Sequence, residues 1–586
     1  MRTNTIFFLF FLVLFINFGN CSVCTTTVGD YSQINTKQDF NYRPRTATFT
    51  DKSFVVVWMN VFGENNYSLH GNYYRKYSHL PNLISCADIQ NLTQSNTFQT
   101  KAHFFEIFDL ATVSMDRENE FVVVFADHNQ KKVYLKTYQI DLEKESGCIT
   151  NTTDKILIES YHAVACSKIR ISNIGKSSDG IIAIVWEEFT NETASHLYVK
   201  LFSLDPSLKI NSTKYLISDQ LLPEYEFPTS SIAKLGSKYF SVAWVDLNLK
   251  INLQLFNISN SESTNDHIHN LTTIQKIDPN IGNDQNIKVD GSSRSSPILV
   301  PILADMESWK GYQNHDTTLL IYANNESMIA QRFVYDEKEQ NEQLKSTKWE
   351  IIQNENTRGS LPDVTWYGNN SFAISFETCK NESGCTMEND RAEKHIRAMV
   401  FQISDDDQII TKGNSIPYLE QKAYPCNKYS RIVDIGHNDF EIVYQVSIEN
   451  KTLIHSQQIE MVTLDIQNPI KSPIIFSQRD FLINIPYNLF EISGDNNYQL
   501  SDNNSQLPDW FLSDFVNNAF YGNAQYSSPT VHVEINATAD ICPISESFDF
   551  DVKIIEYSYI DIKESNSYFL NPVIYLSLLF SLLFLI

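Results

Sequence analysis

Three catalytic motifs are missing from this sequence, and each absence removes a class of enzyme. There is no H-E-x-x-H pair to hold zinc, no G-x-S-x-G elbow to present a nucleophilic serine, and no G-x-x-x-x-G-K loop to cradle phosphates. The histidines and cysteines also lack the spacing of a zinc site. The motifs therefore predict no catalytic residue and no cofactor.

Positive charge, glycine and proline are also scarce. Lys and Arg number 45 against 70 Asp and Glu, and the net charge of −25 argues against a nucleic-acid partner, because a polyanion is repelled by such a surface. Gly and Pro number only 18 each, so turns must depend on Asn, Asp and Ser. Helical periodicity is scarce as well, which favours an all-β protein.

A run of apolar β-formers recurs seven times along the chain. The runs cover residues 54–58, 121–125, 182–186, 239–244, 319–322, 372–376 and 440–444. An alternating strand and a polar turn come before each run, and a third, alternating strand follows it, as at residues 133–138 and 251–256. This pattern is typical of a central strand, buried on both faces, beside an outer strand. One such unit cannot bury its own apolar face, so the units must pack on one another.

The repeat predicts a seven-bladed β-propeller over residues 40–470, because radial packing of small antiparallel sheets covers every apolar face. A stack of β-sandwich domains is the competing architecture, but each sandwich needs about seven strands, whereas each unit here offers about four. The polar insertion at residues 257–296 is expected to form an exposed loop.

The strand pairs also resemble a known repeat. Residues 54–58 read F-V-V-V-W, and residues 328–333 read M-I-A-Q-R-F after the apolar run at 319–322. They are similar to the hairpin repeat of large secreted surface proteins, in which an F-V-V-x-W strand precedes a Y-A-Q-R-F strand. The glycine-rich hairpin tip of that family is mostly replaced here by Asn, Glu and Lys.

Residues 477–557 differ from the repeat and suit one small β-sandwich. The region contains an apolar strand ending at Pro486, the element Leu507-Pro508-Asp509-Trp510, and the element Phe520-Tyr521-Gly522. In this order the elements resemble a dystroglycan-type cadherin-like domain. The resemblance implies an extracellular adhesion-type sandwich, with calcium as a candidate ligand. Glu491 and Asp495 are the carboxylates that would bind calcium in this turn, and an ordinary acidic turn is the alternative.

Both ends of the chain predict an extracellular location. Residues 1–21 have Arg2, an apolar stretch and a small-residue zone, as in a signal peptide. Residues 568–586 are almost wholly apolar with no basic residue after them, and Ser565 and Asn566 lie just upstream in the linker 558–567. This pattern favours a glycolipid (GPI) anchor attached near Ser565 or Asn566, with a single membrane span as the alternative. We expect the protein on the outer face of the plasma membrane.

Glycosylation and disulfide signals agree with that location. Asn-x-Ser/Thr acceptor sites occur at Asn66, Asn91, Asn151, Asn191, Asn211, Asn257, Asn270, Asn325, Asn369, Asn381, Asn450, Asn503 and Asn536. Removing Cys21 with the leader leaves eight cysteines, an even set that fits oxidised pairing. We expect a hairpin disulfide between Cys379 and Cys385, and a second disulfide between Cys148 and Cys166 that brackets one connection.

The predicted function is extracellular recognition or adhesion without catalysis, with a protein or glycan ligand outside the cell. The alternative is a surface glycoside hydrolase or lyase, because some propellers carry paired carboxylates at the channel mouth. Glu187, Glu188, Asp246 and Glu377 follow apolar runs, and either such a role or a solvated hairpin tip would explain them. The sialidase turn S-x-D-x-G-x-T-W is absent.

Overall fold

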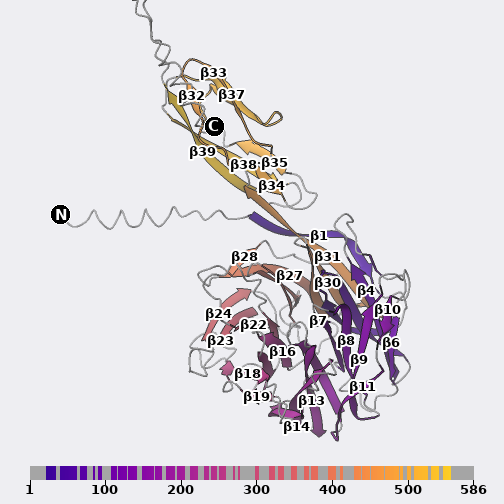
Figure 1. Cartoon of the computed structure of the whole chain (residues 1–586). Coiled ribbons are helices and arrows are strands. Elements are labelled where there is room, and N and C mark those ends of the chain that lie inside the picture. The colour runs from indigo at the N-terminus through magenta and orange to yellow at the C-terminus, as the bar shows by residue number, and fades with distance from the viewer. Residues whose placement is uncertain are drawn as a thin grey trace, which may run out of the picture. The chain divides into compact units, whose positions relative to one another are not determined.

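The computed structural model describes residues 22–555 apart from internal gaps, the longest of which are 278–296, 302–315, 380–393 and 413–427. Every element assigned among the described residues is a β-strand, and these strands form several small antiparallel sheets (Figure 1). The predicted all-β class is therefore confirmed. The chain divides into two units near Thr463, with short segments around residues 493–496 and 541–544 assigned to the first unit.

The first unit is built from successive sheets of about four strands each. The largest sheet joins the two ends of the unit: β1 (Ser22–Gln33), β2 (Phe40–Thr48), β3 (Phe54–Phe62), β4 (Asn66–Arg75), β5 (Ile84–Ser85), β6 (Gln90–Ser95), β29 (Lys428–Gly436), β30 (Asp439–Ile448) and β31 (Lys451–Ile466). The next two are β7 (Phe108–Ser114), β8 (Arg117–Asp127), β9 (Lys132–Ile140), β10 (Ile149–Asn151) with β11 (Ile156–Ser160), and β12 (Ala165–Asn173), β13 (Ile181–Asn191), β14 (Ala194–Ser203), β15 (Tyr215–Leu221).

Three more sheets follow in chain order. They are β16 (Ser230–Leu235), β17 (Tyr239–Val245), β18 (Ile251–Ile258), β19 (Ile268–Asn270) with β20 (Gln275–Ile277); β21 (Ile298–Pro301), β22 (Asp316–Ala323), β23 (Met328–Tyr335), β24 (Lys345–Ile352); and β25 (Asp363–Gly368), β26 (Ser371–Cys379), β27 (Lys394–Ile403), β28 (Ile409–Lys412). The expected exposed loop at 257–296 is partly wrong, because β19 and β20 in it pair with β18.

Each of the seven apolar runs lies in the second strand of a consecutive group of strands, as predicted; the largest sheet contains two of these groups, which begin at β2 and β29, and each of the other five sheets contains one. The runs lie in β3, β8, β13, β17, β22, β26 and β30, each of which is hydrogen-bonded on both sides. Their side chains are buried on both faces, as Val55, Val56 and Val57 illustrate at 0% exposure. Alternate residues of one run pack on the sheet before and on the sheet after it, which explains why the run carries no polar face.

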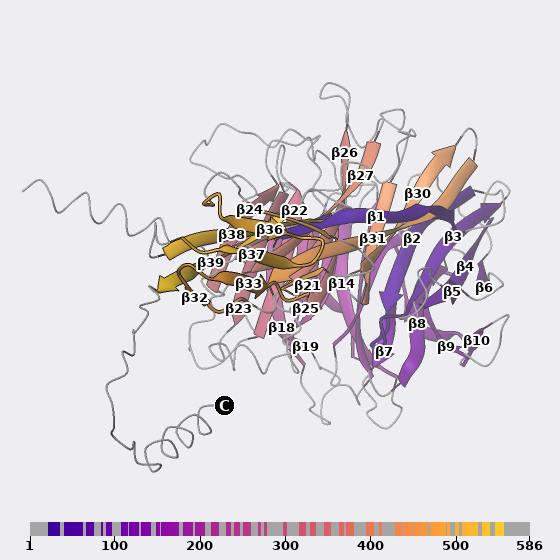
Figure 2. The same ribbon diagram turned by 90° about the horizontal axis from the view of Figure 1, so that it is seen from above.

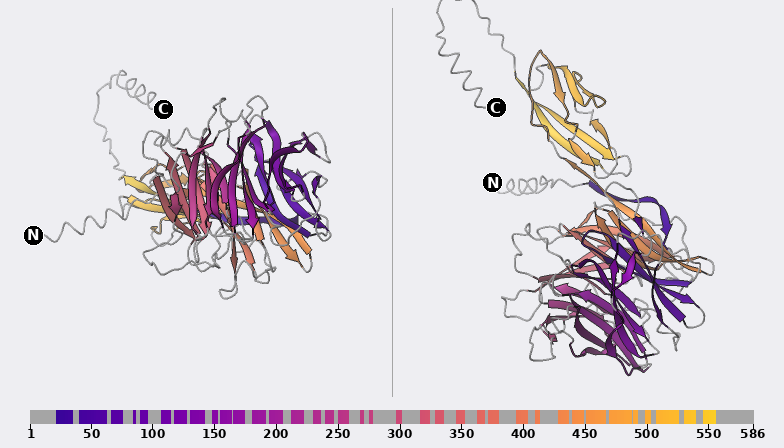
Figure 3. Two further views of the ribbon diagram at one scale, coloured as in Figure 1. Left: turned by 90° about the horizontal axis from the view of Figure 1, so that it is seen from below. Right: turned by 45° about the vertical axis from the view of Figure 1, so that its right-hand side comes forward.

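The first strands of the groups contact one another in succession. β2 contacts β7, and the succession continues through β12, β16, β21 and β25 to β29, which contacts β2 again. The sheets accordingly follow one another around a circle in Figure 1, and the orange strands β30 and β31 lie beside the indigo strands. Seen from above and below, the strands of successive sheets stand side by side (Figures 2 and 3).

Contacts between the start and the end of the first unit join the circle. Phe40 pairs in parallel with Thr452, and the Ile34 amide donates to the Ile454 carbonyl over 2.9 Å. A buried apolar cluster formed by Phe54, Val56 and Trp58 with Val443 and Ile454 fills the space between the first and last groups. The chain ends of the unit are therefore held by both hydrogen bonds and apolar packing.

The second unit contains two sheets and the strand β34 (Phe490–Ile492), which pairs with the last residues of β31. One sheet has the order β32 (Ile474–Phe476), β39 (Ser545–Ile555), β38 (Thr530–Ala539), β35 (Tyr498–Asp502), and the other β33 (Asp480–Asn484), β37 (Ala519–Asn523), β36 (Phe511–Asp514). Phe520 and Phe550 join the two sheets, with ring centroids 6.1 Å apart.

The two sequence elements singled out in this unit meet at Gly522. This residue pairs with Phe481 on one side and with Phe511 on the other. A Cβ atom at position 522 would lie 1.9 Å from the Trp510 carbonyl oxygen, a distance no side chain tolerates. The close approach of two backbones thus explains why a glycine stands here.

Candidate functional site

The first strands of the first unit surround a cavity of about 290 Å³. Its lining comes from all of the strands in the circle: Arg45, Thr46 and Thr48; Asp109 and Leu110; Arg170 and Ile171; Ser231 and Ile232; Pro297, Ile298 and Leu299; Pro362, Asp363, Val364 and Thr365; and Arg431, Ile432 and Val433. Five of these residues are titratable, three arginines and two aspartates. A concave site with a few convergent polar groups is the usual form of a binding site.

Each cavity arginine follows an irregularity in its strand. The register of β2, β12 and β29 shifts just before Arg45, Arg170 and Arg431, respectively. The residue two positions before each arginine has a left-handed backbone: φ is 52° at Arg43, 53° at Lys168 and 58° at Tyr429. Such a conformation costs a non-glycine residue on the order of 1–2 kcal/mol, and bulges of this kind re-aim the side chains that follow. The same device therefore occurs three times around one cavity.

The two cavity aspartates link neighbouring first strands. Asp109 Oδ2 accepts the Ile171 amide over 3.1 Å, and Asp363 Oδ2 accepts the Ile432 amide over 2.9 Å. Ser231 Oγ accepts the Leu299 amide in the same manner over 3.0 Å. The acceptor lies on one first strand and the donor on the next. These side chains therefore hold neighbouring first strands together while they line the cavity.

Arginine and aspartate side chains also pair across the cavity wall. Arg431 Nη1 lies 3.2 Å from Asp363 Oδ1, and Arg45 Nε lies 3.8 Å from Asp109 Oδ1. The Arg431 Nε group donates to the Pro44 carbonyl over 3.3 Å. Three guanidinium groups face two carboxylates, so the lining has one positive charge in excess when both aspartates are ionised.

Burial changes the acidity of both aspartates. It raises the pKa of Asp363 to about 7, against the opposing effects of the Ile432 hydrogen bond and the Arg45 charge, and the charge of Asp109 adds to the rise. Burial also raises the pKa of Asp109, although Arg45 and Arg170 favour its ionised form. The positive excess therefore grows as the pH falls below neutrality.

A second set of polar contacts involves residues that do not line the cavity, and it corrects the sequence-based view of Glu187 and Glu377. Glu377 is buried, and its Oε1 accepts the Tyr429 amide over 2.7 Å. Glu187 is also buried and pairs with Lys168 over 3.1 Å. Both the solvated hairpin tip and the ligand-facing role are therefore wrong for these residues. Their partners Lys168 and Tyr429 are the left-handed residues described above.

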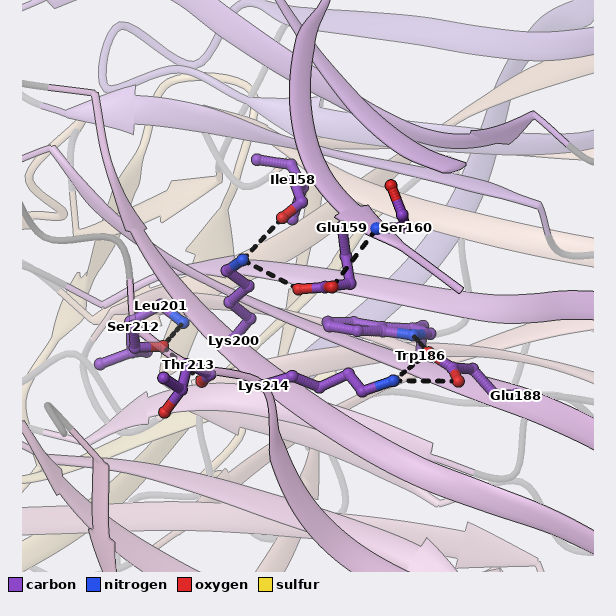
Figure 4. A network of polar contacts seen from close by, with 10 residues as sticks. All are labelled: Ile158, Glu159, Ser160, Trp186, Glu188, Lys200, Leu201, Ser212, Thr213 and Lys214. Atoms are coloured by element: carbon purple, nitrogen blue, oxygen red, sulfur yellow. Dashed lines mark hydrogen bonds and ion pairs between the residues drawn. The ribbon is translucent and has the colours of Figure 1, made fainter. Parts of the chain in front are cut away.

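Glu188 belongs to a network on β13, β14 and their neighbours (Figure 4). Its Oε1 accepts the Trp186 indole N–H over 2.9 Å and lies 2.8 Å from Lys214 Nζ. Nearby, Lys200 Nζ donates to the Ile158 carbonyl over 2.7 Å and pairs with Glu159. Glu188 is thus a buried structural residue.

Asp246 lies in a turn after β17 instead. Its Oδ1 accepts the Lys250 amide over 3.0 Å. This residue is half-buried and supports the local turn, and it does not line the cavity described above.

The predicted disulfide between Cys148 and Cys166 is wrong. Cys148 is disulfide-bonded, whereas Cys166 is a free, buried thiol. Burial raises the pKa of Cys166, which leaves the thiol protonated and unreactive. The spacing of two cysteines along the chain did not reveal that Cys166 packs in the apolar core with Ile169 and Trp186. Cys379 ends β26, and its side chain lies outside the described residues together with Cys385.

Several predicted sites fall partly or wholly outside the described residues. Glu491 is exposed on β34, while Asp495, Ser565 and Asn566 are not described. Within the described part of the chain no group of three metal-binding side chains occurs. No helix described there is long and apolar enough to span a bilayer. Among the glycan acceptors, Asn151 is exposed and Asn257 and Asn536 are half-buried; the other acceptor side chains are not described.

Comparison with known proteins yields structural likenesses only. No family model and no curated protein matches the chain. A protein of unknown function from Dyadobacter fermentans is similar at 10% identity and a TM-score of 0.35, over 75% of this chain and 99% of its own. The Hadza microbial sialidase Hz136 is similar at 10% identity and a TM-score of 0.31, over 72% of this chain and 65% of its own. An α-L-arabinanase from Penicillium chrysogenum is similar at 11% identity and a TM-score of 0.30, over 60% of this chain and 93% of its own. At these values no ligand or activity is transferred to this chain.

Proposed function

We propose that this chain is a cell-surface glycoprotein that recognises an extracellular protein or glycan through the cavity of a seven-bladed β-propeller. The observation that carries the proposal is the convergence of all seven first strands on one cavity, to which every one of them except β21 contributes a polar side chain. The succession of first-strand contacts from β2 round to β29 and back supports seven blades.

A recognition role suits the state of the cavity aspartates. Asp109 and Asp363 each accept a backbone amide and each lie beside an arginine. Carboxylates held in this way fix the wall of a binding site and keep its shape constant between the free and the bound protein. Pre-organisation of this kind lowers the entropic cost of binding.

The remaining parts of the chain complete the proposal. The second unit is a cadherin-like spacer, supported by the meeting of the L-P-D-W and F-Y-G elements at Gly522. The C-terminal segment tethers the protein through a glycolipid anchor. A phosphatidylinositol-specific phospholipase should then release the protein from intact cells, whereas retention would favour a membrane span. A calcium titration tests Glu491 and Asp495, since only a bound ion would raise the melting temperature.

One observation favours a second function, glycoside hydrolysis or lyase chemistry. Two carboxylates share the cavity, and the pKa of Asp363 is about 7, the value a general acid requires at neutral pH. A panel of chromogenic sugars separates the two functions. Binding on a glycan array without turnover supports recognition; hydrolysis that disappears in Asp363→Asn but persists in Asp514→Asn, a change at the end of β36 in the second unit, would establish the enzyme.

A further inference from the structure

We propose that Arg45, Arg170 and Arg431 form an oxyanion site, which binds the carboxylate, sulfate or phosphate group of an extracellular ligand. This proposal deepens the proposed recognition function and rests on it. All three side chains line one cavity, and each comes from a different first strand, β2, β12 or β29. They are 6%, 9% and 8% exposed, so their charges act in a site largely shielded from bulk water.

The backbone gives the first argument. Of the strands that line the cavity, β2, β12 and β29 carry both a left-handed residue and a register shift, and these three strands supply the arginines. A strained backbone conformation persists only where the surrounding structure holds it, and such strain gathers at binding sites. Three repetitions of one strained device, each followed by an arginine in the same cavity, are best explained by a shared ligand group.

Charge and geometry give the second argument. The two cavity aspartates partly neutralise the arginines, Asp109 acting on Arg45 and Arg170 and Asp363 on Arg431, yet three arginines outnumber two aspartates in the lining. A guanidinium group is planar and presents five donors in a fork that matches two oxygens of an anion. Three such forks on separate walls suit a group with several oxygens, and a simple spherical anion such as chloride would use few of these donors.

The size of the cavity gives the third argument. Its volume of about 290 Å³ exceeds the roughly 30 Å³ of one water molecule many times over, so it admits an anionic group together with part of the molecule that carries it. The other lining residues include Thr46, Thr365 and Ser231, whose hydroxyl groups are of the kind that complete the coordination of an oxyanion.

The test is a calorimetric titration of the full protein, released from cells, at pH 6 with sodium sulfate, sodium phosphate and sodium acetate. Sodium chloride at matched ionic strength is the reference, and comparing the three salts identifies the preferred oxyanion. We expect at least one of them to bind more tightly than chloride. Arg170→Gln should weaken this binding about tenfold or more, since one charge-assisted fork is lost.

Two further variants make the titration decisive. Arg75→Gln removes the same charge from β4, where Arg75 pairs with Asp51 away from the cavity, and should leave the affinity unchanged. Arg170→Lys keeps the charge but loses the fork, so it should bind with intermediate affinity even if Arg170→Gln fails to fold. The proposal is overturned if none of the three oxyanions binds better than chloride, or if the Arg75 and Arg170 variants lose affinity equally.

The outcomes also separate this proposal from the recognition function. Anions that bind in an Arg170-dependent way, with no capture of any glycan or cell surface, would refute recognition and leave the oxyanion site intact. Glycan or cell binding that survives Arg170→Gln would refute the oxyanion site and leave recognition intact.

Discussion

Replacing Asp363 by asparagine should change the pH dependence of stability of the first unit. The native carboxyl has a pKa of about 7, whereas its ordinary value is 3.8. Because the folded-state pKa is the higher one, the native protein holds the proton more tightly than the unfolded chain between these values. The stabilising contribution is therefore fully present below pH 4 and is lost as the pH rises through 7.

The magnitude follows from the size of the shift. A shift of about three pKa units corresponds to about 4 kcal/mol at roughly 1.4 kcal/mol per unit. Asparagine has no proton to lose in this range, and its amide oxygen still accepts the Ile432 amide. Between pH 4 and pH 8, the free energy of unfolding of the wild type should thus fall by about 4 kcal/mol relative to that of Asp363→Asn.

The assay is urea unfolding of both proteins at several pH values, with the two units followed separately. Asp514→Asn is the matched control, because hydrogen bonds from Asn517 lower the pKa of Asp514, and this group is already ionised above pH 4.5. The free energy of unfolding of this control should change with pH in the same way as that of the wild type from pH 4.5 to pH 8. A difference in the free energy of unfolding between wild type and Asp363→Asn that stays constant over this range would refute the raised pKa of Asp363. So would a difference that shifts in favour of the wild type as the pH rises.

Three further predictions concern the packing of the chain. Gln445→Ala should destabilise the first unit by about 1–3 kcal/mol, because the buried Arg43 amide loses the 3.1 Å hydrogen bond that joins the last group to the first; an unchanged urea midpoint would contradict this. Gly522→Ala should lower the stability of the second unit by about 3 kcal/mol, since the new methyl group meets the Trp510 carbonyl, and calorimetry should show the first unit unaffected. Cys166 should react with a maleimide only after unfolding, and rapid labelling of the native protein at this position would show that the thiol is accessible.

Local sequence pattern was sufficient to predict the strands. The apolar runs in β3 and β30 could be recognised because a strand buried on both faces needs apolar residues at every position. The same pattern misplaced Glu187 and Glu377. They follow apolar runs and looked like the start of a turn, but their strands continue to Asn191 and Cys379, and their partners lie on other strands.

The cavity was missed because its residues are far apart in the chain. Arg45 and Arg431 come from opposite ends of the first unit and meet only once the circle of strands is joined. A signal was nevertheless present: an arginine stands in the strand just before three of the seven apolar runs, in β2, β12 and β29. This repetition is visible when the strands that precede the apolar runs are compared with one another. It is not visible in the runs themselves.

The most direct test of the whole account is a crystal structure of the released protein grown with sodium tungstate, a heavy oxyanion visible by its anomalous scattering. The account predicts seven blades around one cavity and a tungstate peak between Arg45, Arg170 and Arg431. A different number of blades in the ring, or tungstate bound elsewhere with this cavity filled only by water, would contradict it.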